Sequence, residues 1–83
     1  MPDIITQGIP WEMKAPLGNK KYTIKNIVQS ASHQSENIII DLRRSKMNEN
    51  TAINEIRQYF EKSKRIRRVK IITKDAEMLD FSK

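Results

Sequence analysis

The chain has 83 residues, of which 16 are Lys or Arg and 10 are Asp or Glu, so its formal net charge is +6. This length predicts one domain with one modest core, comprising residues 1–83. The sequence contains no cysteine, which excludes disulfides and thiolate metal sites. Its apolar runs are shorter than the roughly 20 residues that a membrane-spanning helix needs, so we expect no membrane anchor.

Two short extended runs open the chain, at residues 3–7 and 11–14, and they flank Gly8 and Pro10. Glycine tolerates positive φ and proline fixes φ, so the residues between the runs indicate a turn. The pattern predicts a β-hairpin whose pairing begins at Trp11 or later, because proline has no N–H to donate to a ladder.

Helices and strands alternate in the rest of the chain. Apolar residues spaced as one helical stripe predict a helix capped by Thr23 and fading by Ser32–Ser35. Residues 37–42 form a continuous β-branched run, which is typical of a strand buried on both faces. The remaining expected elements are a helix over 51–64, a strand over 67–73 and an edge strand over 78–81. The order β-β-α-β-α-β(-β) predicts an α/β fold with a small mixed β-sheet and helices packed on the sheet.

The first hairpin carries three residues that suit phosphodiester chemistry. Side chains at i and i+2 of a strand share a face, so Glu12 and Lys14 project together while Trp11 and Met13 face the opposite layer. The turn is expected to bring Asp3 back towards Glu12. We therefore predict a catalytic cluster of Asp3, Glu12 and Lys14.

Asp3 and Glu12 would bind Mg²⁺ or another divalent metal, because carboxylate oxygens are hard ligands for such a cation. The metal would polarise a phosphoryl oxygen and lower the pKa of a bound water. Lys14 would orient the attacking water and stabilise developing negative charge. The alternative is a surface salt bridge between Lys14 and either acid, which contributes little energetically.

Basic residues gather in two clusters that suit a polyanion such as RNA or DNA. A solvated face that keeps the domain soluble is the alternative interpretation. We favour Arg43, Arg44 and Lys46 for phosphate binding, because they follow the carboxyl end of a strand. The second candidate cluster consists of Lys64, Arg65, Arg67 and Arg68.

The sequence Pro2-Asp3 followed by Glu12-x-Lys14 on a hairpin resembles the PD-(D/E)XK nuclease motif. More narrowly, the runs at residues 11–16, 37–44 and 71–75 resemble the CdiA C-terminal tRNA nuclease domains of contact-dependent growth inhibition, and the resemblance extends from Pro2 to Phe81.

The resemblance implies a metal-dependent endoribonuclease, a hydrolase of phosphodiester bonds that cleaves tRNA. It also implies a cognate immunity protein, delivery as part of a secreted or cell-surface toxin, and action in the bacterial cytoplasm. Helical glutamines contact substrate in the PD-(D/E)XK superfamily, which makes Gln29 a candidate for nucleic-acid binding; solvent exposure is the alternative for this residue.

One departure from the superfamily pattern leaves alternatives open. A helix normally precedes the first acid, whereas only two residues precede Asp3, so the chain is expected to be a truncated domain, a minimal version or an inactive remnant that retains binding without cleavage. The rival functions are a non-catalytic nucleic-acid-binding module and a fragment that binds an immunity protein.

For His33 we favour a solvated position near a helix end, and for Trp11 core packing. Asp41 is either a third acid near the site or the cap of the turn that follows it.

Overall fold

The computed structural model describes the backbone of residues 4–6 and the whole of residues 8–17 and 22–83. Its elements are β1 (Ile4–Thr6), β2 (Ile9–Lys14), α1 (Thr23–Ser32), β3 (Asn37–Asp41), α2 (Glu49–Lys62), β4 (Arg68–Ile72) and β5 (Met78–Ser82). The predicted order of elements is therefore confirmed, including the edge strand at the end.

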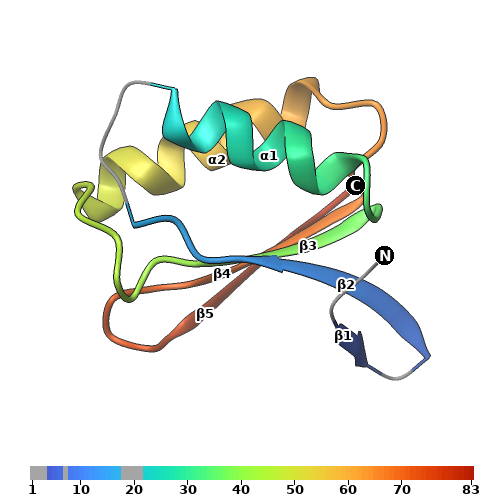
Figure 1. The fold of residues 1–83 in the computed structure, drawn as a ribbon, viewed down its shortest axis with the longest axis horizontal. Helices are drawn as coiled ribbons and strands as arrows, with labels where there is room; N and C mark the ends of the chain where they lie inside the picture. The colour runs from blue at the N-terminus through green and yellow to red at the C-terminus, as the bar shows by residue number, and fades with distance from the viewer. Residues whose placement is uncertain (1–3, 7, 18–21) are drawn as a thin grey trace.

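The strands form one five-stranded sheet in the order β1-β2-β3-β4-β5. The pairs β2–β3 and β3–β4 are parallel, whereas the outer pairs β1–β2 and β4–β5 are antiparallel. The mixed strand direction predicted from the sequence is thus confirmed. Both crossover helices lie on the same face of the sheet (Figure 1), so the protein has one helical layer and one sheet layer.

The hydrophobic core fills the space between these two layers. Apolar stripes on α1 and α2 face the sheet, as the helical spacing predicts. From the sheet, the residues of β3 and β4 that share the helix-facing side complete the core. Its largest fully buried side chains are Ile24, Ile38, Ile40, Leu42, Ile56, Ile66, Val69 and Ile71. Ile39 of β3 points to the other face and is also buried, so the prediction of a strand buried on both faces is confirmed.

The helix starts differ from those predicted. Tyr22, not Thr23, is the N-cap of α1, and it makes no side-chain capping hydrogen bond. Helix α2 begins at Glu49, two residues earlier than expected, because the side chain of Asn48 accepts a hydrogen bond from the N–H of Thr51 at 3.1 Å. A local cap therefore extended this helix beyond its apolar stripe.

Strand β2 also begins earlier than predicted, because Pro10 is part of it. Pro10 pairs with Ile5 across the hairpin. Its carbonyl accepts hydrogen bonds from the Ser35 hydroxyl at 3.0 Å and from Asn37 Nδ2 at 3.2 Å. These bonds attach the start of β2 to the α1–β3 connection, so the missing N–H of the proline does not end the strand.

Candidate functional site

Glu12 and Lys14 lie on the helix-facing side of β2. In the parallel register Glu12 is opposite Ile38 and Lys14 is opposite Ile40, and both isoleucines belong to the core. The Lys14 Nζ atom is 3.9 Å from Glu12 Oε1. The side chain of Glu12 is 5% exposed and that of Lys14 is 30% exposed. The structure therefore brings together a buried carboxylate and a partly exposed ammonium, on the shared face that strand alternation predicts.

The third member of the predicted cluster, Asp3, lies outside the described residues. Within the described strands, Glu12 is the only carboxylate on the helix-facing side of the sheet. In the described part of the chain no group of three His, Cys, Asp or Glu residues is arranged to hold a metal ion. Carboxylate oxygens suit Mg²⁺, so Glu12 fits the role of one protein ligand, and a second would have to come from Asp3.

A basic loop follows β3 at the same edge of the sheet as Lys14. Because β2, β3 and β4 are parallel, their carboxyl ends meet at one edge, and Arg43 and Arg44 lie there beside Ala15. The crossover helices run back from this edge, so the positive ends of both helix dipoles also lie there. Cations and helix N-termini at one edge favour an anionic ligand.

Arg43 and Arg44 differ in what they can offer such a ligand. The Arg43 guanidinium donates to both carboxylate oxygens of Asp41, with Nη2–Oδ2 at 2.8 Å and Nε–Oδ1 at 3.0 Å. The side chain of Arg44 makes no hydrogen bond or ion pair with another described residue. Arg44 is therefore the more available cation of the pair.

Asp41 is the cap of the turn after β3. Its Oδ1 accepts a hydrogen bond from the backbone N–H of Arg43 at 3.0 Å. The side-chain hydrogen bond from Arg43, together with that backbone bond and the charges of Arg43 and Arg44, holds the pKa of Asp41 below its usual value, although burial acts in the opposite direction. Asp41 also alternates with Ile40 along β3, so it faces away from the side of the sheet that holds Glu12 and Lys14.

A lysine that sequence reasoning did not single out holds this loop in place. Lys74 Nζ donates to the carbonyl of Met47 at 2.7 Å, and the Lys74 backbone N–H donates to Glu49 Oε1 at 2.7 Å. These bonds tie the turn after β4 to the loop that carries Arg44 and Lys46 and to the first residue of α2. The sequence signal, a lysine directly after a strand, is too common to reveal this role.

The second basic cluster lies at the opposite end of the sheet. Arg67 directly precedes β4 and Arg68 begins it, whereas Arg43 and Arg44 follow the end of β3, and these strands are parallel. Arg65 Nη1 is 3.0 Å from Nδ1 of His33, the exposed C-cap residue of α1. The helix-end position expected for His33 is confirmed. The two predicted phosphate-binding clusters therefore do not form one patch at Lys14.

Two other candidates lie away from the Glu12–Lys14 pair. Gln29 is exposed on the side of α1 that faces α2, where it shares a shallow hollow with Tyr59 and Ser63. Trp11 is buried on the opposite face of β2, as predicted. Neither side chain is positioned to act with Glu12 and Lys14.

A sequence model of the family described as "Contact-dependent growth inhibition CdiA C-terminal domain" matches residues 1–78. The match covers nearly the whole chain. The chain belongs to this family. The family membership agrees with the resemblance found in the runs around Glu12, β3 and the end of β4. Among curated protein sequences, none matches the chain significantly.

A solved structure from Burkholderia pseudomallei, a CdiA-CT/CdiI toxin and immunity complex, has a similar fold. The TM-score is 0.73 and the sequence identity is 21%, over 99% of this chain and 62% of that chain. This chain thus spans about three fifths of the length of that structural neighbour. None of its described helices is long and apolar enough to cross a membrane.

Proposed function

We propose that this CdiA C-terminal domain is the RNA-cleaving part of a toxin, a metal-dependent endoribonuclease that acts on tRNA. The observation that carries the proposal is the pair Glu12–Lys14, in which a carboxylate buried beside the core has an ammonium 3.9 Å away. A buried charge costs free energy unless it is compensated, so its presence in an apolar layer favours a functional role. The spacing resembles the PD-(D/E)XK motif, which supports hydrolysis of a phosphodiester bond.

In this proposal Asp3 and Glu12 hold a divalent cation, for which Mg²⁺ is the natural candidate. The bound cation supplies a Lewis acid for the phosphoryl oxygen and a water of lowered pKa. Lys14 orients the attacking water and offsets the negative charge that develops on the phosphoryl oxygens. Its partial exposure allows a substrate phosphate to reach Nζ, whereas the buried Glu12 carboxylate stays shielded from bulk water.

Arg44 and Lys46 hold the RNA backbone next to this pair. Both follow β3 at the edge of the sheet where Lys14 ends β2, and neither side chain makes a hydrogen bond or ion pair with another described residue. Lys74 keeps their loop attached to the sheet through Met47. The loop backbone is therefore anchored before the substrate arrives, and its two exposed cations can reach a phosphate bound here.

The proposal includes a cognate immunity protein, which the toxin and immunity complex of the structural neighbour supports. It also includes delivery of the domain as the tip of a cell-surface or secreted toxin, and action on tRNA in the cytoplasm of the target bacterium. Family membership supports the delivery as part of a cell-surface toxin.

The test is cleavage of total tRNA by wild type, by Lys14→Ala and by Lys62→Ala, each with Mg²⁺ and with EDTA. Lys62 is an exposed cation at the end of α2 and serves as a control matched in charge. We expect wild type and Lys62→Ala to cleave only with Mg²⁺, and Lys14→Ala to be slower by about 100-fold or more. Undiminished cleavage in EDTA would refute the metal mechanism, and undiminished cleavage by Lys14→Ala would refute the assigned site.

A non-catalytic RNA-binding module is the second candidate. The observation that favours it is the burial of Glu12, since only 3% of this residue is exposed and a metal site must admit substrate. This alternative predicts salt-sensitive RNA binding without cleavage under any metal condition, and binding unaltered by Glu12→Gln.

A further inference from the structure

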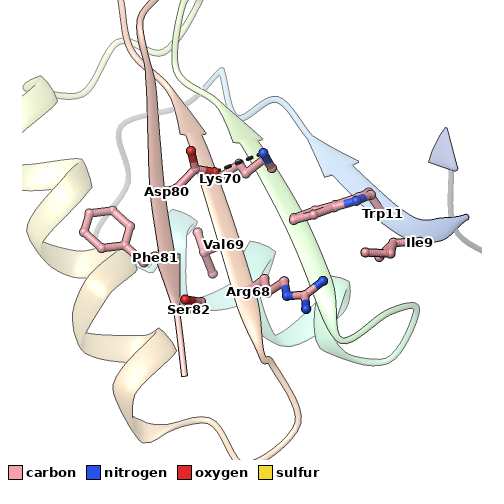
Figure 2. Close-up of a pocket in the computed structure, with 8 residues that line it drawn as sticks. All are labelled: Ile9, Trp11, Arg68, Val69, Lys70, Asp80, Phe81 and Ser82. Atoms are coloured by element: carbon pink, nitrogen blue, oxygen red, sulfur yellow. Dashed lines mark ion pairs between the residues drawn. The ribbon is translucent and has the colours of Figure 1, made fainter. Parts of the chain in front are cut away.

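The sheet has a second face that no described helix covers (Figure 1). Strand alternation directs Trp11 of β2 and Arg68 and Lys70 of β4 to this uncovered face, opposite the side of Glu12 and Lys14. A groove of about 290 Å³ runs over it (Figure 2). The side chains that point into the groove come from β2, β4 and β5: Ile9, Trp11, Arg68, Lys70, Asp80 and Ser82.

The charges in this groove leave one cation available. Lys70 Nζ forms an ion pair with Asp80 Oδ1 at 3.1 Å, drawn as a dashed line in Figure 2, so these two charges offset each other. Among the described residues, Asp80 is the only acid that lines the groove. The Arg68 guanidinium makes no hydrogen bond or ion pair with another described residue. Figure 2 shows it extending from β4 towards Ile9 and Trp11.

The wall opposite Arg68 is apolar and fixed. Trp11 is 5% exposed, and the Lys70 Nζ atom lies 5.3 Å from the centroid of the indole ring of Trp11. The indole is therefore a packed wall and not an open stacking platform. A guanidinium facing an apolar wall matches the alternation of a nucleic-acid strand, in which each charged phosphate is followed by a flat, largely apolar base.

We propose that this groove binds the backbone of a single RNA strand, with one phosphate on Arg68 and the adjoining ribose and base against Ile9 and Trp11. The inference rests on the proposed function in taking RNA as the ligand. Arg68 begins β4, and the edge near Lys14 is four residues further along, about 13 Å at roughly 3.3 Å per residue. Because the groove and the Glu12–Lys14 pair lie on opposite faces of the sheet, the RNA strand must also pass around this edge, so the groove holds nucleotides several positions away from the bond that is cut. It is a remote subsite for a long substrate.

The position of Trp11 provides a direct measurement, because it is the only tryptophan in the chain. A single-stranded RNA of about 12 nucleotides is titrated in EDTA into protein that carries Lys14→Ala, so that no cleavage occurs, while Trp11 fluorescence is recorded. We expect a saturable change in fluorescence. Adding Arg68→Ala should weaken binding by about 5- to 10-fold and reduce the slope of log affinity against log salt by about 0.7, the loss of one phosphate contact.

Two further variants separate a local contact from a general effect of charge. Lys62→Ala also removes one positive charge but lies in the helical layer, so we expect it to weaken binding by less than about 2-fold. Arg68→Lys keeps the charge and should restore most of the salt slope, but less of the affinity, because lysine cannot hold a phosphate with two parallel hydrogen bonds.

The outcomes for this groove and for the nuclease are distinguishable. Equal effects of Arg68→Ala and Lys62→Ala, or RNA binding without a change in Trp11 fluorescence, would overturn the groove even if wild type cleaves tRNA. Binding of an acidic protein but not RNA at this face would also overturn it. Arg68-dependent binding by a protein that never cleaves RNA would support the groove and refute the nuclease.

Discussion

The two faces of the sheet differ in how strongly a charged residue on them indicates a functional role. The helix-facing side is buried, since Ile38, Ile40 and Ile71 are 0% exposed. Among the described strand residues on this side, Glu12 is the one acid. A carboxylate there loses hydration, so its presence requires a compensating partner or a function. On the uncovered face, charged residues remain near water and need no special explanation. There the arrangement is informative, because Lys70 is paired with Asp80 and Arg68 is not.

The largest expected difference between the two faces is in the free energy of unfolding, when two neighbouring isoleucines of β3 are each replaced by alanine. Ile40 faces the helices and Ile39 faces the uncovered side, where 7% of it is exposed. Ile40→Ala should lower the free energy of unfolding by about 2–5 kcal/mol, because it leaves a cavity in the core. Ile39→Ala should cost roughly half as much, since surrounding side chains can relax into solvent. Urea denaturation of both variants checks this difference. Equal losses would show that the uncovered face is packed as tightly as the core.

A smaller effect is expected from the two arginines after β3. Arg44→Ala should weaken RNA binding by about 5-fold, whereas Arg43→Ala should weaken it less, because Asp41 already holds the Arg43 guanidinium. Affinities measured with the Lys14→Ala protein in EDTA make the comparison. A larger loss for Arg43→Ala would mean that the ion pair opens when RNA binds.

The same pair gives a prediction for pH. Arg43→Ala should raise the pKa of Asp41 towards its usual value of 3.8, which an NMR titration of the carboxyl carbon measures. Because the pKa is depressed in the folded protein, the stabilisation is present at pH values above the unfolded pKa. It is lost as the pH falls through the folded pKa. Wild type and Arg43→Ala should therefore differ in stability at neutral pH and converge in strong acid.

The smallest effect is expected for Asp80→Asn. The Asp80 side chain is 65% exposed and that of Lys70 is 33% exposed, so loss of this ion pair should change stability by less than about 1 kcal/mol. Removing the acid from the groove should tighten RNA binding by about 2-fold, because Lys70 becomes available to phosphate. Unchanged or weaker binding in the fluorescence titration would indicate that the RNA backbone does not approach β5.

The order of the elements could be predicted from the sequence, because each core strand or helix carries an apolar pattern of its own period. The helix starts were less predictable. Asn48 caps α2 through a side-chain hydrogen bond, so this helix starts before its apolar stripe. Thr23, the expected cap of α1, is the first residue of that helix and not its N-cap. The joint orientation of Glu12 and Lys14 followed from alternation within one strand.

The groove on the uncovered face could not be predicted in the same way. Ile9, Arg68 and Asp80 come from three strands, and only the strand order places them around one space. The Lys74–Met47 bond is equally non-local. Asp3 lies outside the described residues, so its role in the catalytic cluster stays a prediction.

Glu12 and Lys14 should act as one catalytic unit, and a double-mutant cycle on tRNA cleavage tests this directly. Initial rates are measured with Mg²⁺ for wild type, Glu12→Gln, Lys14→Ala and the double variant, with unfolding curves to confirm that each protein is folded. If the two residues serve one step, each single change should lower the rate by about 100-fold or more, and the double variant should be scarcely slower than either. A folded single variant that cleaves at the wild-type rate would contradict the account.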